Sequence, residues 1–140
     1  MEFHKILVPV SGSEADEEAV KLACRLAKKN KSKIYAVYVI TVKRTLPIDA
    51  EIESEIRKAE GILNHIESVA EEQEYEVETD LLQAREAAPT IVEEAVERGA
   101  DLILMGVTYK RRFGQFSLGN TVPYVLKNAP CRVILYHQPT

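Results

Sequence analysis

Two glycines frame a loop near the end of the chain whose composition suits the binding of an anion. The loop reads MGVTYKRRFGQFSLGNTV over residues 105–122 and contains Gly106 and Gly119. Gly119 precedes a predicted helix, where free backbone N–H groups and the helix dipole favour a phosphate. Asn120 and Thr121 add side-chain donors at the same place. A second interpretation stays open, in which Gly119 and Asn120 only cap the helix.

The basic residues of this loop contrast with the charge of the whole chain. Lys110, Arg111 and Arg112 are consecutive, whereas the formal net charge of the 140 residues is -4. Such cations can lie beside a phosphate, or they can belong to a solvated loop. An acidic chain of this kind argues against a general nucleic-acid or anionic-membrane surface. We therefore expect any anion site to be local.

The residues that most often perform catalysis are scattered along the chain. His4, His65 and His137 lack the spacing of metal ligands, and no phosphate-binding P-loop or nucleophile-elbow motif is present. Cys24 and Cys131 have the spacing of neither a metal knuckle nor a redox pair. We expect a protein that binds without turnover, with at most slow hydrolysis of a bound phosphate compound, no metal site and free thiols suited to the cytoplasm.

The elements that must position the loop follow from hydrophobic periodicity. Predicted strands cover residues 3–10, 34–40, 75–82, 100–105 and 131–136, and predicted helices cover residues 13–28, 49–73, 89–99 and 120–128. Ser13 and Asp16 have the form of a capping box at the start of the first helix. Pro89 is expected to begin the third helix and Gly99 to end it. No segment approaches the roughly 20 apolar residues of a membrane helix.

The alternation of strands and helices predicts a single α/β domain over residues 1–140. Since hairpin signals are lacking, the strands should form a doubly wound, five-stranded parallel sheet with helices on both faces and right-handed crossovers. Ligands of such sheets bind beyond the carboxyl ends of the strands, where the strand order reverses. Residues 9–14, PVSGSE, and residues 106–121 have the composition for that position.

Over essentially its whole length the sequence resembles the universal stress protein family. The resemblance lies in the opening KILVPVSGSEADEEAV, in the closing segments ADLILMG and LGNTVPYVLKNAPCRVIL, and in the five-strand order between them. It implies the strand order 3-2-1-4-5 and a Rossmann-like site that binds ATP, with or without Mg²⁺. It also implies a cytoplasmic homodimer that acts as a regulator in a stress response.

The resemblance also assigns residues to the site. Gly106 and Gly119 match the first and third glycines of the family's nucleotide motif, and Val10 and Val39 match positions that line the adenine pocket. Pro9 and Met105 would complete the wall around the base, while Gly106, Gly119, Asn120 and Thr121 would contact the phosphates. The predicted nucleotide-binding residues are Pro9, Val10, Ser11, Val39, Met105, Gly106, Tyr109, Gly119, Asn120 and Thr121.

Three of these positions depart from the family's pattern. Tyr109 replaces the second glycine, Asn120 replaces a Ser or Thr, and Ser11 replaces an Asp. If that glycine has a positive φ angle, a Tyr there costs on the order of 1 kcal/mol and fills space beside the phosphates. Ser11 offers a hydroxyl where a carboxylate would contact the nucleotide. Asn120 is the mildest change because its amide can still donate.

These departures leave an alternative function open. The chain could be a member of the family that does not bind nucleotides and contacts a protein partner through the loop of residues 107–118. It could also be related to the domains that are attached to membrane transporters.

The last strand, residues 131–136, is expected to be a sheet edge whose only charged residue is Arg132. An unguarded apolar edge is normally covered, which predicts a homodimer that pairs through this strand.

Overall fold

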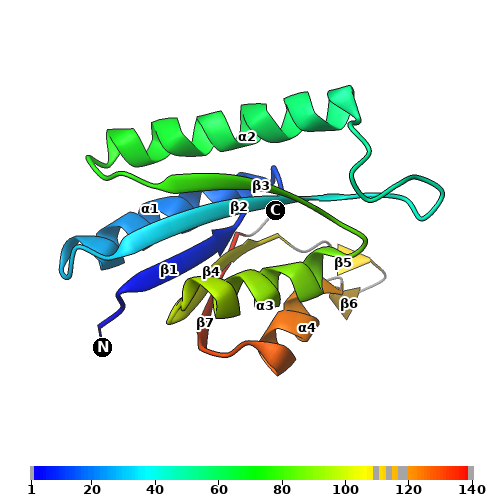
Figure 1. The fold of residues 1–140 in the computed structure, drawn as a ribbon. Coiled ribbons are helices and arrows are strands. Elements are labelled where there is room, and N and C mark those ends of the chain that lie inside the picture. The colour runs from blue at the N-terminus through cyan, green and yellow to red at the C-terminus, as the bar shows by residue number, and fades with distance from the viewer. Residues whose placement is uncertain (1, 109–110, 113–114, 117–119, 139–140) are drawn as a thin grey trace.

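A five-stranded parallel sheet forms the centre of the computed structural model, which describes residues 2–108, 111–112, 115–116 and 120–138 (Figure 1). Its order is β3-β2-β1-β4-β7. The strands are β1 (Lys5–Pro9), β2 (Lys33–Thr41), β3 (Glu78–Ala84), β4 (Leu102–Val107) and β7 (Arg132–His137). Since β7 is the fifth strand of the sheet along the chain, the predicted order 3-2-1-4-5 is confirmed.

Helices cover both faces of the sheet, as the strand–helix alternation predicts (Figure 1). They are α1 (Glu14–Lys28), α2 (Glu53–Glu72), α3 (Ala87–Arg98) and α4 (Thr121–Asn128). Successive residues of β1 point to opposite faces, so Ile6 and Val8 pack under α1 and α2 whereas Leu7 packs under α3 and α4. All three side chains are fully buried, which explains the continuous apolar run of this strand.

The third strand differs from its predicted bounds, because β3 begins at Glu78 and not at residue 75. The helix α2 ends at Glu72, and Glu74 then adopts a positive φ of 57°. Tyr75 belongs to this turn, and its hydroxyl donates a hydrogen bond to the Ser32 carbonyl. At the other end β3 continues to Ala84 beside the end of β2. The first three residues of the predicted strand, from Tyr75 to Val77, therefore belong to the connection after α2 and not to β3.

The loop of residues 106–121 contains a two-stranded ribbon that we did not predict. Its strands, β5 (Arg111–Arg112) and β6 (Gln115–Phe116), pair antiparallel. No hairpin signal in the sequence indicated this ribbon, which is separate from the parallel sheet. Pairing of this kind provides hydrogen-bond partners for backbone groups of a long connection, and two residues per strand are too few for periodicity to reveal them.

The helices depart from their predictions mainly at their starts. The helix α2 begins at Glu53, four residues later than expected, and continues through Gly61 without interruption. The helix α3 begins at Ala87, so Pro89 lies in its first turn, where a missing N–H donor is tolerated. Gly99 ends α3 in the left-handed conformation, with φ of 66°, as predicted. Within the described part of the chain, no helix combines the length and apolarity needed to cross a bilayer.

Candidate functional site

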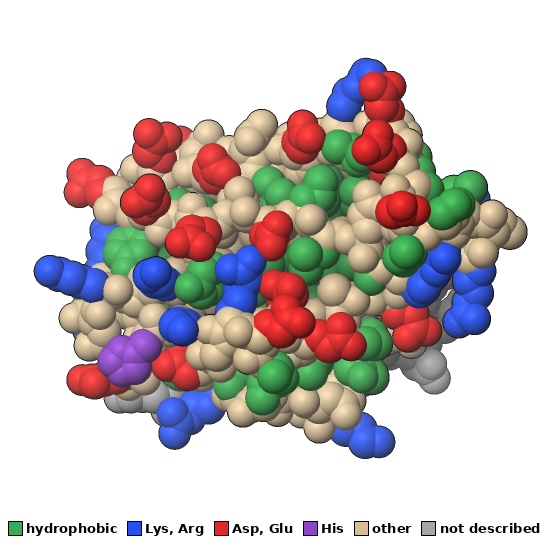
Figure 2. Space-filling model, in the orientation of Figure 1, with side chains coloured by type: hydrophobic (Ala, Val, Ile, Leu, Met, Phe, Trp, Pro, Cys, Tyr) green, Lys and Arg blue, Asp and Glu red, His purple; other side chains and the backbone are tan. Residues whose placement is uncertain are grey.

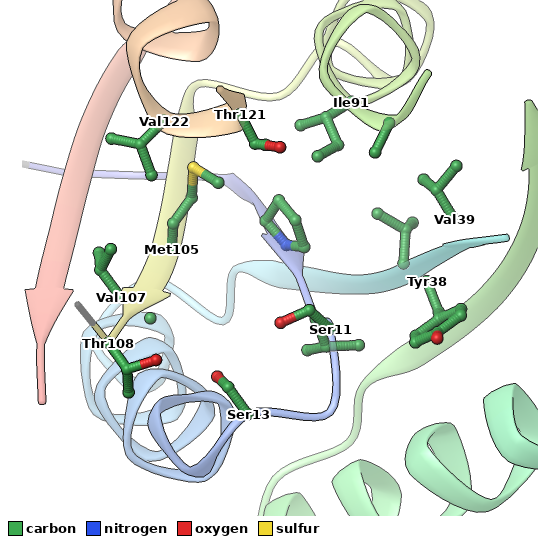
Figure 3. Close-up of a pocket in the computed structure, with 15 residues that line it drawn as sticks. Ser11, Ser13, Tyr38, Val39, Ile91, Met105, Val107, Thr108, Thr121 and Val122 are labelled. Atoms are coloured by element: carbon green, nitrogen blue, oxygen red, sulfur yellow. The ribbon is translucent and has the colours of Figure 1, made fainter. Parts of the chain in front are cut away.

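A cavity of about 260 Å³ opens at the carboxyl ends of β1, β2 and β4 (Figure 3). The strand order reverses here, because β1 lies between β2 on one side and β4 on the other. This is the position at which doubly wound sheets bind their ligands. The lining residues are Pro9, Val10, Ser11, Ser13, Val37, Tyr38, Val39, Ala87, Ile91, Met105, Gly106, Val107, Thr108, Thr121 and Val122.

The described wall of the cavity is neutral, although acidic side chains are spread over the face of the molecule shown in Figure 2. It combines apolar side chains with the hydroxyl groups of Ser11, Ser13, Thr108 and Thr121, and none of its residues is charged. Figure 3 shows the Thr121 hydroxyl directed toward the open space between α4 and α3. A mostly apolar cavity with a few convergent polar groups suits a flat, uncharged ring system with hydrogen-bonding edges.

Seven of the ten residues that the sequence assigned to the site line this cavity. They are Pro9, Val10, Ser11, Val39, Met105, Gly106 and Thr121. Asn120 is exposed and does not line it. Tyr109 and Gly119 lie outside the described residues, as does half of the proposed partner-binding loop of residues 107–118. The structure thus brings together the loops of residues 9–14 and 106–121, which are about 90 residues apart in the chain, because the carboxyl ends of neighbouring parallel strands meet at one edge of the sheet.

Gly106 has a structural role that does not depend on a ligand. A Cβ atom at this position would lie 2.5 Å from the carbonyl oxygen of Ala15, which belongs to the first turn of α1. Contacts this short do not occur in folded proteins, so a larger residue would force α1 away from β4. The first glycine of the motif therefore allows a helix to pack closely on the strand that forms one wall of the cavity.

The start of α4 lies at the opposite side of the cavity from α1. Asn120 is in the N-cap position, but its side chain makes no capping hydrogen bond to the helix. Asn120 thus occupies the capping position, as one interpretation of the sequence expects, but without the side-chain hydrogen bond of a cap. Its backbone has φ of -98° and ψ of -24°, close to helical values, whereas a capping side chain needs the extended conformation. Thr121, the first residue of α4, is the one that lines the cavity.

The expected capping box at the start of α1 is also wrong. Ser13 is the N-cap residue with an extended backbone, but its hydroxyl does not cap the helix. The carboxylate of Asp16 instead accepts hydrogen bonds from the N–H groups of Ser11 and Gly12. Gly12 has φ of 89°, which few other residues adopt, and this turns both N–H groups toward Asp16. Asp16 therefore binds the loop before the helix and not the helix itself.

Sequence reasoning missed the residues that complete the cavity. Two signals were available, because Val37 shares a face of β2 with Val39, and Val107 shares a face of β4 with Met105. Ala87 and Ile91 are one turn apart on α3. The lining residues outside the predicted loops are Val37, Tyr38, Ala87, Ile91 and Val122, while Ser13, Val107 and Thr108 lie within the predicted loops of residues 9–14 and 106–121 but were not named as site residues. No sequence signal shows how closely α3 approaches the sheet, which depends on tertiary packing.

The histidines and cysteines lie away from the cavity. His65 Nε2 is 3.7 Å from a carboxylate oxygen of Glu17 and links α2 to α1 at the surface. Cys24 is buried, Cys131 is partly buried, and both are free thiols. Over residues 2–108, 111–112, 115–116 and 120–138, no group of three or more His, Cys, Asp or Glu side chains is placed to hold a metal ion.

Comparison with known proteins decides the family. The model of the universal stress protein family matches residues 2–137. The chain belongs to this family. Universal stress protein MJ0531 of Methanocaldococcus jannaschii is 36% identical over 143 residues, which cover 98% of this chain and 84% of that protein. The fold that the sequence resemblance implied is thus the fold of the family to which the chain belongs.

Solved structures of other universal stress proteins share this architecture. One from Archaeoglobus fulgidus has a TM-score of 0.75 and 25% sequence identity, covering 96% of this chain and 94% of its own. A second is described as the universal stress protein from Archaeoglobus fulgidus in complex with dAMP. It has a TM-score of 0.75 and 24% sequence identity, and the match covers 96% of this chain and 98% of that one. The doubly wound α/β fold with strand order 3-2-1-4-5 is common to them and to this universal stress protein.

Proposed function

We propose that this universal stress protein binds an adenine nucleotide, ATP, in the cavity between β1 and β4. It would act as a cytoplasmic regulator in a stress response and not as an enzyme that turns ATP over. The observation that carries the proposal is the convergence of seven predicted site residues on one cavity at the reversal of strand order. The dAMP in the complex from Archaeoglobus fulgidus supports an adenine nucleotide as the ligand class.

The chemistry of the wall suggests how the nucleotide would lie. The base would occupy the neutral part of the cavity between Val10, Val39 and Met105. Its phosphates would extend toward Thr121, because this residue begins α4 and the N-terminus of a helix favours an anion. Mg²⁺ would enter with the phosphates of ATP.

Isothermal titration calorimetry with Mg-ATP tests the proposal, after native mass spectrometry has checked for ligand retained from purification. We expect a dissociation constant in the micromolar range or tighter. Absence of both binding heat and retained nucleotide would contradict the proposal.

A pair of isosteric variants tests the position of the ligand. Thr121→Val removes a hydroxyl from the cavity and should weaken Mg-ATP binding by about 2-fold to 10-fold, the cost of one hydrogen bond. Thr90→Val is the matched control, because Thr90 lies on α3 outside the cavity and its hydroxyl donates to the Glu86 carbonyl. Equal affinities of the two variants would place the nucleotide elsewhere.

We further propose that two copies of the chain pair through β7. This strand is an edge of the sheet, and its central residues from Val133 to Tyr136 are only partly buried. Unpaired backbone groups on an apolar edge favour association with a second strand. Light scattering should give twice the mass of the chain, and Ile134→Lys should reduce it to that of a monomer. Val96→Lys, at a 61% exposed position on α3, should leave it unchanged.

A further inference from the structure

Asp16 is buried although it lies in the first turn of a surface helix. Only 4% of the residue is exposed, whereas Glu14 in the same turn is exposed and Glu17 is half-buried. Acidic residues in a first turn usually act through the helix dipole from the surface, where they keep their hydration. Burial of a carboxylate is costly unless hydrogen bonds replace its water, so the contacts of Asp16 need a separate explanation.

Those contacts connect the carboxylate to one wall of the cavity. Asp16 Oδ2 accepts hydrogen bonds from Gly12 N–H at 2.7 Å and from Ser11 N–H at 3.1 Å. Asp16 Oδ1 lies 3.4 Å from the Ser13 hydroxyl, which donates to it. Ser11 and Ser13 both line the cavity. Three consecutive residues of the loop after β1 are thus bonded to a single side chain.

We propose that Asp16 is a positioning residue of the nucleotide site, which fixes residues 11–13 as a preformed wall of the cavity. The inference rests on the proposed function. Binding to a preformed wall avoids the entropic cost of ordering an exposed loop when the ligand arrives. Because Ser11 N–H and Gly12 N–H are already bonded to a carboxylate, they are also unable to bind a phosphate. The phosphates of the ligand are therefore directed to the opposite side of the cavity.

An uncharged side chain at residue 16 distinguishes the positioning role from a helix-dipole role, because it can keep the hydrogen bonds of Asp16 but not its charge. In Asp16→Asn, the amide oxygen can take the place of Oδ2 and accept both backbone hydrogen bonds. The amide nitrogen can take the place of Oδ1 and donate to the Ser13 hydroxyl oxygen, which is also an acceptor. Asn thus keeps all three hydrogen bonds and loses only the charge, whereas Asp16→Ala loses both.

Calorimetric titration of the full chain with Mg-ATP separates the two roles. We expect Asp16→Asn to bind within about 3-fold of the wild-type affinity and Asp16→Ala to lose at least about 10-fold. Glu14→Ala, which removes an exposed carboxylate from the same turn, should bind as the wild type does. Equal losses in Asp16→Asn and Asp16→Ala would assign the effect to charge, and no loss in Asp16→Ala would remove the role altogether.

Amide hydrogen exchange, measured by NMR in the absence of a ligand, tests the positioning role of Asp16 independently of nucleotide binding. The N–H groups of Ser11 and Gly12 should exchange slowly in the wild type and in Asp16→Asn. They should exchange at least about 10-fold faster in Asp16→Ala, while amides of β1 keep their protection. Rapid exchange of both amides in the wild type would overturn the positioning role. Slow exchange in a protein that does not bind Mg-ATP would instead contradict the proposed function alone.

Discussion

Gly106 and Ala15 are in such close contact that a single methyl group on Gly106 would collide with the Ala15 backbone. The added carbon would lie 2.5 Å from the carbonyl oxygen and 2.9 Å from the Ala15 Cβ. This contact joins the end of β4, which lines the candidate site, to the first turn of α1, which directly follows the lining residue Ser13. The absence of a side chain at residue 106 therefore helps to determine the width of the cavity.

Gly106→Ala should lower the free energy of unfolding by about 1–3 kcal/mol, the usual cost of adding atoms to a packed region. The neighbour is backbone, so α1 must shift as a unit. Gly61→Ala is the control, because nothing lies within 4 Å of the Cβ it would add in the middle of α2. That variant should gain about 0.5–1 kcal/mol in urea unfolding experiments. Equal effects of the two substitutions would show that helix packing on β4 is not tight.

Arg98 links α3 to the sheet through two ion pairs and a ring contact that a lysine side chain could not make together. Its guanidinium contacts Asp80 at 2.8 Å and Glu94 at 2.9 Å and lies 4.5 Å from the centre of the Tyr35 ring. Hydrogen bonding to Glu94 raises the pKa of Arg98 further above its ordinary value. Because a lysine cannot make both ion pairs and stack on the ring, Arg98→Lys should cost about 1 kcal/mol of unfolding free energy.

A control for Arg98 is available on α2. Arg57 forms an ion pair with Glu53 at 3.4 Å, and both side chains are more than three-quarters exposed. Such surface pairs contribute little to stability. Arg57→Lys should therefore leave the midpoint of urea unfolding unchanged. A similar change in both variants would mean that the contact with Tyr35 and Asp80 adds nothing.

The charge of Asp16 should make stability depend on pH. Burial raises the pKa of Asp16 above its ordinary value of 3.8, although hydrogen bonds from Gly12 and Ser11 oppose the change. The folded protein then binds the proton more tightly than the unfolded chain, so this group's contribution to stability falls as pH rises through the interval above 3.8. Asp16→Asn removes that dependence and should gain stability relative to the wild type as pH rises from about 3 to roughly neutral. A constant difference across this range would contradict the direction of the pKa change.

The two thiols should react slowly with iodoacetamide while the protein is folded. Burial raises the pKa of Cys24 and of Cys131, so a smaller fraction of each is thiolate at a given pH. Cys24 is fully buried and should react more slowly than the partly buried Cys131. Mass spectrometry of timed samples at about pH 8 measures both rates, with a urea-unfolded sample as the reference. Modification of Cys24 at its unfolded rate would contradict its burial.

The strands and the position of a ligand beyond their carboxyl ends could be predicted from the sequence because they depend on local patterns and on topology, whereas the strand order came from the resemblance to the family. Apolar runs such as Ile6 to Val8 are typical of buried parallel strands, and the position of a ligand follows from the topology. The ribbon of β5 and β6 was missed because its strands are two residues long. The start of β3 was predicted three residues early because Tyr75 and Val77 alternate with charged residues although they precede the strand.

The sequence by itself determined the fold class and the loops that form the site, since periodicity and glycine positions act over a few residues. Only the tertiary structure decided the role of individual side chains. Asp16 looked like the carboxylate of a capping box with Ser13, yet the turn at Gly12 directs the N–H groups of Ser11 and Gly12 to it. Gly106 looked like a phosphate-binding glycine, yet Ala15 leaves no space for a side chain there. The role of Gly106 depends on the approach of α1, a segment distant in the chain, and the role of Asp16 depends on the direction of the backbone at Gly12. Residue spacing specifies neither.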